Sequence, residues 1–166
     1  MKEIPLTKGR VALVDDEDFE YLNQFNWYTY LNPRGYAYAN RQKDRHGTTS
    51  TTVAMHNVIM NAPKGLKVDH IDFNGLNNQK SNLRIATHEE NQRHQRKFRT
   101  NTSEFKGVKW DKGKWRAAIT IRGHEIYLGR FVNVVDAAKC YDAEVVKQFG
   151  EFAVTNASLC LYPTNP

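Results

Sequence analysis

The sequence predicts an α+β protein made of short antiparallel strands and a few helices. Three observations predict this class. Residues 1–54 are rich in β-branched and aromatic residues bounded by turn formers, which indicates a strand-rich region. Residues 106–131 alternate apolar and polar side chains in three runs, which predicts a three-stranded antiparallel meander. Residues 135–149 repeat apolar side chains at helical spacing, which predicts an amphipathic helix after the meander.

The N-terminal region contains several predicted elements. Residues 4–14 indicate two short strands, and Asp15 or Asp16 can cap a short helix after them. Aromatic residues on both sides of the turn at 32–35 predict a hairpin. The segment "TTSTTVAM" is typical of another strand, and "HNVIMNA" predicts a short helix that ends before Pro63.

The middle of the chain changes from a polar loop to a helix. Residues 67–85 are polar and rich in asparagine and glycine turn formers. Thr87 and Glu90 form a capping box, so a helix is expected to begin near Thr87 and to run to about Lys97 or Arg99. The segment "RTNTSEF" is typical of a linker, and it indicates a boundary between two small domains.

The net charge of +6 is concentrated in one segment. Residues 1–92 carry 11 basic and 11 acidic side chains, residues 93–116 carry 9 and 2, and residues 117–166 carry 4 and 5. The excess positive charge therefore lies between residues 93 and 116. On charge alone, this segment is either a solvated linker or a contact for a polyanion.

Composition also argues against some classes of protein. Cys140 and Cys160 match no CxxC spacing, which argues against a zinc site built on thiolates and favours two reduced thiols. No apolar run has the length of a membrane-spanning helix, and the N-terminus carries no apolar segment of the secretory kind. A soluble cytoplasmic protein without a membrane partner is expected.

The polar stretch carries side chains suited to hydrolysis. His70 is the residue type that can take a proton from water near neutral pH, and its neighbour Asp69 is a hard oxygen ligand for Mg²⁺ or Mn²⁺. A hairpin that folds back onto the following helix would bring Asp69, His70 and Asn91 together, with Asn82 holding the loop. The alternative is an ordinary polar loop in which His70 is merely exposed.

The spacing of this stretch resembles that of the HNH endonucleases, which have a ββα-metal fold. His70, Asn82 and Asn91 stand at the signature positions as H-x11-N-x8-N, and "VDHIDFNGLNNQKSNLRIAT" is similar to the homing branch. The resemblance implies that His70 is the general base, that Asn82 is structural, and that Asn91 binds a divalent metal together with Asp69. Asn91 departs from the final histidine of the signature. A ligand set of Asp and Asn favours Mg²⁺ or Mn²⁺.

Two further histidines are candidates for supporting roles. His94 would share a helix face with Asn91, and either approaches the metal or phosphate or lies at the helix surface near DNA. His56 either supports the site or is a partly buried core histidine. Arg84 is expected in a structural ion pair.

The C-terminal meander has a basic face. Alternation places Lys114 and Arg116 on one face and Trp115 on the other, where it is expected to pack under the final helix. The segments "FKGVKWDKGKWRAAI", "YLGRF" and "AAKCYDAEVVKQFG" resemble an AP2 DNA-binding domain over residues 101–156. In that family the sheet reads bases in the major groove. Several matching positions carry lysine, alanine or threonine here, so fewer bidentate guanine contacts are expected.

These resemblances predict the organisation and the DNA contacts. The predicted parts are a strand-rich region of the nuclease at 1–54, an HNH core at 55–97, a linker at 98–104, an AP2-like domain at 105–156 and a tail at 157–166. The predicted DNA-binding residues are Arg93, Arg96, Lys97, Arg99, Lys106, Lys109, Lys114, Arg116 and Tyr127.

The sequence thus predicts a metal-dependent homing-type DNA endonuclease that leaves 5′-phosphate and 3′-hydroxyl ends. Its partner would be double-stranded DNA, with no protein partner evident and a monomer expected. It would act in the cytoplasm, that of the host cell if the gene is phage-encoded. One alternative is an AP2-like DNA-binding regulator with an inactive HNH half. Another is an RNA-binding or structural module.

Overall fold

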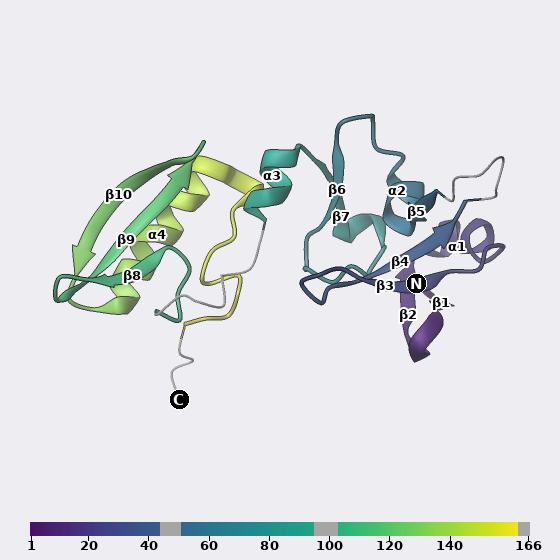
Figure 1. The fold of residues 1–166 in the computed structure, drawn as a ribbon, viewed down its shortest axis with the longest axis horizontal. Coiled ribbons are helices and arrows are strands. Elements are labelled where there is room, and N and C mark those ends of the chain that lie inside the picture. Colours follow the sequence, from purple (N-terminus) through teal and green to yellow (C-terminus); the bar gives the residue numbers. More distant parts are fainter. Residues whose placement is uncertain (44–50, 95–102, 163–166) are drawn as a thin grey trace. The chain divides into compact units, whose positions relative to one another are not determined.

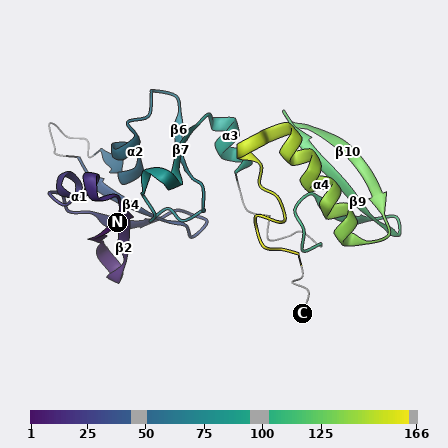
Figure 2. The same ribbon diagram turned by 180° about the vertical axis from the view of Figure 1, so that it is seen from behind.

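A computed structural model describes residues 1–43, 51–94 and 103–162, which form a mixed α+β structure (Figures 1 and 2). The chain divides into two compact units, Met1–Asn91 and Gln92–Pro166. In the described ranges, none of the helices is long and apolar enough to cross a membrane. The α+β class predicted from the sequence is confirmed.

The first unit begins with two antiparallel elements. β1 (Lys2–Pro5) and β2 (Val11–Val14) pair around the 3-10 turn Thr7–Gly9, and α1 (Asp16–Leu22) follows them. β3 (Tyr28–Leu31), β4 (Ala37–Gln42) and β5 (Thr52–Ala54) form an antiparallel sheet in that order. Asn32 closes the β3–β4 turn because its Oδ1 accepts from the backbone N–H groups of Arg34 and Tyr36 at 2.9 and 3.0 Å. α2 (Met55–Met60) then ends at Asn61 in the left-handed conformation.

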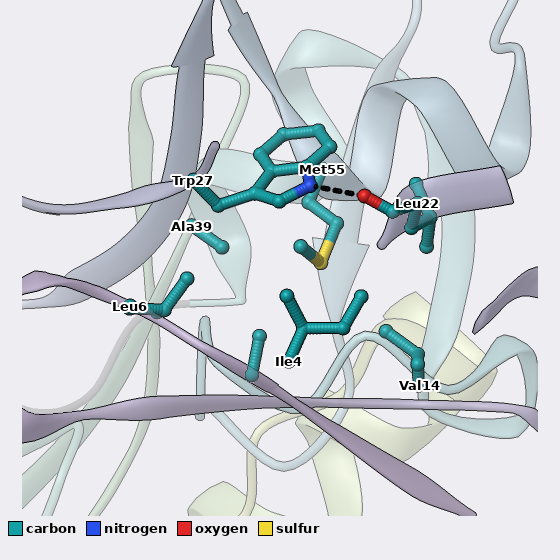
Figure 3. Close-up of a cluster of buried hydrophobic side chains, with 8 residues drawn as sticks. Ile4, Leu6, Val14, Leu22, Trp27, Ala39 and Met55 are labelled. Carbon is teal, nitrogen blue, oxygen red and sulfur yellow. Dashed lines mark hydrogen bonds between the residues drawn. The ribbon is translucent and has the colours of Figure 1, made fainter. Parts of the chain in front are cut away.

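The core of this unit lies between the first hairpin, α1 and the β3–β5 sheet (Figure 3). The indole of Trp27 lies in it and donates a hydrogen bond from Nε1 to the backbone carbonyl of Leu22 at 2.8 Å. That bond ties the start of β3 to the end of α1 and satisfies a polar atom that burial would otherwise leave unpaired. The other buried members are Ile4, Leu6, Ala12, Val14, Ala39 and Met55.

A second hairpin and a short helix complete the unit. β6 (Lys67–His70) pairs antiparallel with β7 (Leu83–Ala86) across a loop that contains the 3-10 turn Lys80–Asn82. The capping box predicted at Thr87 opens α3 (His88–Arg93): the backbone N–H of Thr87 donates to Glu90 Oε2 at 2.8 Å, and that of Glu90 donates to Thr87 Oγ1 at 3.2 Å. The helix ends at Arg93, earlier than predicted, and residues 95–102 lie outside the described ranges.

The N-terminal hairpin supports the β6–β7 loop directly. The backbone of Leu13 donates to the carbonyl of Leu76 and accepts from the N–H of Asn78, both at 2.8 Å. Asp15 does not cap α1 with its side chain. Its Oδ2 instead accepts from the backbone N–H of Lys80 at 2.8 Å. Gly75 lies against Tyr38, where a Cβ would collide with the tyrosine ring. The strand-rich region therefore holds the loop that carries the polar stretch.

The second unit is a three-stranded antiparallel sheet covered by one long helix (Figures 1 and 2). β8 (Val108–Asp111), β9 (Lys114–Ile121) and β10 (His124–Phe131) are ordered β10-β9-β8, and α4 (Val134–Phe149) packs on one face. Ile119 is buried against Tyr141 and Val145 of α4, and Trp115 packs against the core of the unit. This arrangement matches the meander and the amphipathic helix expected from the sequence.

The chain after α4 belongs to the core of the second unit. Gly150 ends the helix with a φ of +52°, and the 3-10 turn Gly150–Phe152 follows. The carboxylate of Asp142 accepts from the N–H of Asn156 at 2.7 Å and from the hydroxyl of Tyr162 at 2.8 Å. Leu161 and Tyr162, which fall in the segment predicted as a tail, pack against the core.

Candidate active site

Asp69 and His70 are the last two residues of β6, and each is only 6% exposed. In the β6–β7 register, Asp69 lies opposite Arg84 and His70 lies opposite Leu83. Consecutive residues of a paired strand point to opposite sides of the ladder. The two candidate residues therefore have different neighbours.

Asp69 is held in a buried ion pair. Arg84 donates to Asp69 Oδ2 from Nε at 2.9 Å and lies within 2.8 Å of it through Nη2. The side chains are 7% and 12% exposed, so little water screens the pair. Arg84, predicted to make a structural ion pair, makes it with the proposed metal ligand.

His70 lies in a small cluster of rings and amides. Its ring centroid is 5.0 Å from that of His56 and 6.0 Å from that of Tyr38, and its Nε2 lies 3.3 Å from Asn78 Oδ1. Burial lowers the pKa of His70, while the hydrogen bond with Asn78 and the charges of Asp72 and Asp69 act in the opposite direction. The imidazole is therefore neutral at physiological pH.

Asn78 favours one tautomer of His70. The Asn78 side chain is fully buried, and its Nδ2 donates to the backbone carbonyl of Leu76 at 3.2 Å. That bond directs Oδ1 toward His70, and an amide oxygen can only accept. The proton of the neutral imidazole is therefore favoured on Nε2, which leaves Nδ1 as the basic nitrogen.

His56 is the second histidine of the cluster. It lies in the first turn of α2, with its ring edge-to-face to both His70 and Tyr38. Burial, and secondarily the nearby His70, lowers the pKa of His56 to about 3. Its Nδ1 is buried and has no hydrogen-bond partner among the residues that the structure describes. His56 is therefore a neutral imidazole beside His70 with one polar atom available.

Asn82 organises the loop between the two strands. Its Oδ1 accepts from the backbone N–H of Asp72 at 3.0 Å, and its Nδ2 donates to Asp72 Oδ1 at 2.9 Å and to the carbonyl of Asn77 at 2.8 Å. Asp72 also accepts from the N–H of Asn74 at 2.7 Å. These bonds close the loop around the side-chain amide of Asn82, which indicates a structural role for this residue.

Asn91 lies one turn into α3, the helix that follows β7, and its backbone N–H donates to the carbonyl of Thr87 at 3.0 Å. Within residues 1–43, 51–94 and 103–162, no group of three or more His, Cys, Asp or Glu side chains is placed to hold a metal ion. The proposed ligands number only two, the carboxylate of Asp69 and the side-chain amide of Asn91. Both offer oxygen, so the donor chemistry fits a hard divalent cation, with Arg84 as its competitor for Asp69.

The second unit presents a charged outer face on its sheet. The register aligns Lys109 and Arg130 on either side of Arg116. Arg116 Nη2 lies 2.5 Å from Glu125 Oε1, and Lys109 Nζ lies 3.7 Å from Glu125 Oε2. The face combines basic groups with an acid, and the 55% exposed ring of Tyr127 lies over the Arg116 guanidinium at 5.6 Å. Lys114 is exposed at the start of β9.

The other predicted DNA contacts are placed differently or not described. Lys106 precedes β8 and is half-buried, and burial lowers the pKa of its ammonium to about 8 against the opposing effect of Asp142. His94 follows the end of α3. The side chain of Arg93 and all of Arg96, Lys97 and Arg99 lie outside the part of the chain that the structure describes.

Asn78 is the site residue that sequence reasoning missed. It is one of several asparagines in a turn-rich segment, and nothing local distinguishes it from Asn77. Its position depends on the backbone bond to Leu13, far away in the chain. The Asp69–Arg84 pair could have been predicted from the sequence. A hairpin in which residue 70 pairs with residue 83 places residue 69 opposite residue 84.

The β6–β7 hairpin carries the buried Asp69 and His70, and the helix that follows it, α3, carries Asn91. A family model described as HNH endonuclease matches residues 61–93, which contain β6, β7 and α3. The uncharacterized HNH endonuclease L560 of Acanthamoeba polyphaga mimivirus is 30% identical over 152 residues, which cover 90% of this chain and 76% of that protein. The chain therefore belongs to the HNH endonuclease family.

Two other relatives match parts of the chain. Protein 3.8 of Escherichia phage T7 is 42% identical over 65 residues, covering 38% of this chain and 54% of that protein. An AP2-like ethylene-responsive transcription factor of Arabidopsis thaliana is 33% identical over 61 residues, covering 37% of this chain and 18% of that protein. No solved structure matches. The enzyme class predicted from the sequence, an endonuclease, is confirmed.

Proposed function

We propose that this enzyme hydrolyses phosphodiester bonds of double-stranded DNA with His70 as the general base. The observation that carries the proposal is the environment of His70: a buried, neutral imidazole whose Nε2 is engaged by Asn78. A base must be unprotonated at working pH and must keep its basic nitrogen pointed at the water. Burial supplies the first condition, and Asn78, by engaging Nε2, leaves Nδ1 as the nitrogen that can accept the proton.

The reaction follows from the position of this base. Nδ1 of His70 accepts a proton from water while the water oxygen forms a bond to phosphorus. The bond from phosphorus to the 3′ oxygen breaks, and that oxygen leaves with a proton taken from solvent. The products are a 5′-phosphate and a 3′-hydroxyl end. Asn82 keeps the loop closed while His70 acts.

Asp69 and Asn91 are the proposed ligands of a divalent cation, Mg²⁺ or Mn²⁺. When bound, such an ion stabilises negative charge on the phosphate and on the departing oxygen. In this chain the carboxylate of Asp69 is already oriented by Arg84, so its position does not depend on the ion. His56 is proposed to position the His70 ring through their edge-to-face contact.

The sheet of the second unit is proposed to hold the DNA. Lys109, Lys114, Arg116 and Tyr127 on its outer face supply phosphate affinity and limited base contacts. The partial likeness to an AP2-like transcription factor supports this role. The mimivirus relative, whose name is that of an HNH endonuclease, supports the nuclease activity, and the proposal adds that the enzyme is of the homing type and acts within a host cell.

The test is incubation of supercoiled plasmid with the full chain in Mg²⁺, in Mn²⁺ and in EDTA. The proposal predicts cutting with either ion and none in EDTA. Polynucleotide kinase should label the ends only after phosphatase treatment, as expected for 5′-phosphates. Tight binding without cutting in any ion would instead favour a DNA-binding regulator with an inactive nuclease half.

A further inference from the structure

A pocket in the first unit has no role in the proposed reaction. Its volume is about 420 Å³, within the ~300–1,000 Å³ range of small-molecule sites. It lies where the end of α1 meets the sheet, beside the first residues of β3 and the last of β4. The lining residues are Gln24, Phe25, Asn26, Tyr28, Arg41 and Gln42.

Arg41 packs against aromatic rings beside this pocket and has a donor that no described residue uses. Its guanidinium carbon lies 4.1 Å from the ring centroid of Phe25 and 5.6 Å from that of Trp27, so it makes cation–π contacts with two aromatic rings. Its Nη1 makes one long hydrogen bond of 3.4 Å to the carbonyl of Gln42. Its Nε is buried and has no hydrogen-bond partner in the described ranges. A guanidinium carries five N–H donors, so the Arg41 side chain can donate further hydrogen bonds to a bound ligand.

The chemistry of the lining selects an anion with hydrogen-bonding edges. Arg41 is the charged residue of the lining, and none of the six lining residues is a carboxylate. Three amides, from Gln24, Asn26 and Gln42, offer both donors and acceptors, and Tyr28 offers an aromatic surface. An inorganic anion would use Arg41 but leave the amides and the ring without a function. A sugar–phosphate unit of DNA can contact all of them, because arginine, amide and tyrosine side chains commonly bind phosphate and sugar oxygens.

We propose that this pocket binds one sugar–phosphate unit of the DNA substrate, with the phosphate on Arg41 and the sugar against Tyr28 and the amides. The proposal rests on the DNA endonuclease function proposed above, and it adds a second DNA contact outside the active site. Such a contact positions the duplex before the cut. Its loss should therefore reduce DNA affinity and leave the rate of cutting at saturating DNA unchanged.

The experiment measures binding without cutting. The full chain with His70→Ala is titrated with a labelled DNA duplex at several salt concentrations. Arg41→Met, added to this background, should weaken binding about tenfold and lower the salt slope by ~0.9, the amount for one lost phosphate contact. Arg10→Met, at an exposed position outside the pocket, is the matched control and should change neither quantity by as much as Arg41→Met does.

Further variants keep the test valid if Arg41→Met fails to fold. Asn26→Ala and Gln42→Ala change exposed lining residues and leave the Arg41–Phe25 contact in place, so each should weaken binding severalfold. A folded Arg41→Met protein that binds DNA like the Arg10→Met control would overturn the proposal. Unaltered affinity in both amide variants would also overturn it.

Two more measurements separate related explanations. Wild-type protein is titrated with free deoxyadenosine monophosphate, for which no saturable binding is expected below millimolar concentration. Micromolar binding would identify a site for free nucleotides and overturn the proposal of a DNA contact. Failure of the proposed endonuclease function is distinguishable, because it would appear as absence of cutting by the wild type whatever Arg41 does to binding.

Discussion

Arg84 donates a hydrogen bond from Nε to Asp69 Oδ2 from the directly opposite position on the neighbouring strand, and its Nη2 lies 2.8 Å from the same oxygen. The pair is buried, so the guanidinium neutralises a carboxylate that would otherwise be costly to remove from water. The same carboxylate is the proposed ligand of the divalent cation. The guanidinium of Arg84 therefore lies next to the proposed position of the divalent cation.

This relationship predicts that metal compensates for the loss of Arg84. Arg84→Ala removes the guanidinium that is paired with the buried carboxylate of Asp69, which should cost ~3–5 kcal/mol of folding free energy in EDTA. Millimolar Mg²⁺ or Mn²⁺ should restore part of that loss by supplying the missing charge, and should stabilise the wild type less. Urea unfolding with and without the ion measures both effects.

The control for this prediction is Arg130→Met, which breaks the more exposed ion pair with Asp111 in the second unit. The Arg130→Met variant should lose little folding stability, and the ion should stabilise it no more than it stabilises the wild type. If Arg84→Ala loses the same stability in EDTA and in Mg²⁺, Asp69 does not bind the cation.

The two buried histidines predict lower stability in mild acid. The pKa of His56 is about 3 in the folded chain and ~6.5 in an unfolded one, so the unfolded state binds more protons between these values. Stability is therefore greatest above pH 6.5 and falls as the pH drops toward 3. The slope is at most ~1.4 kcal/mol per pH unit for one histidine. His70, whose pKa is also lowered, contributes with the same sign.

Urea unfolding of His56→Gln at pH 7.5 and pH 5.5 isolates the contribution of His56 to the loss of stability in mild acid. The variant should lose less stability than the wild type between the two values, because glutamine does not titrate. An identical loss in both proteins would mean that His56 accepts its proton in the folded state.

The Asn78–His70 contact predicts a shift in the pH dependence of cutting. Asn78→Asp places a carboxylate against Nε2, which favours the imidazolium and raises the pKa of His70. Because the base acts only when unprotonated, the acidic limb of the rate profile should move to higher pH. Asn77→Asp, at the adjacent half-buried loop position, is the control and should move the limb less. A uniform rate loss in Asn78→Asp without movement of the limb would indicate a merely structural role for Asn78.

The outer face of the β8–β10 sheet predicts that an acid there opposes DNA binding. Glu125 lies within 4 Å of both Lys109 and Arg116, so Glu125→Gln removes a negative charge from the proposed DNA contact. Affinity for duplex DNA at low salt should rise severalfold, with a steeper salt dependence. Glu144→Gln, on the helix that packs on the opposite face, should change little. Equal effects of the two variants would remove this face from the contact surface.

Local signals were enough to predict much of the architecture. The Thr87–Glu90 capping box identified the start of α3, and alternation in residues 114–121 identified β9 and its two faces. These signals depend on neighbours in the chain, so the sequence displays them directly. The nuclease hairpin and helix were located in another way, by the resemblance of the spacing of His70, Asn82 and Asn91 to the HNH signature, and the family model matches the same region.

Contacts between distant segments could not be predicted. Asp15 has the position of a helix cap, but it binds the backbone of Lys80 because the first hairpin packs against the β6–β7 loop. The role of Asn78 and the stacking of Arg41 on Phe25 likewise depend on tertiary packing. Lys106 was expected beside the outer face, but its backbone is held by Asn156 and its side chain is half-buried.

The most direct test of the account is the single-turnover rate of DNA cutting by His70→Ala, measured at saturating DNA and divalent ion. Loss of a general base should lower the rate ~10²–10⁴-fold while DNA affinity is retained, and His124→Ala, at an exposed position in the second unit, should cut like the wild type. A His70→Ala protein that cuts within a few fold of the wild-type rate would contradict the assignment of His70 as the base.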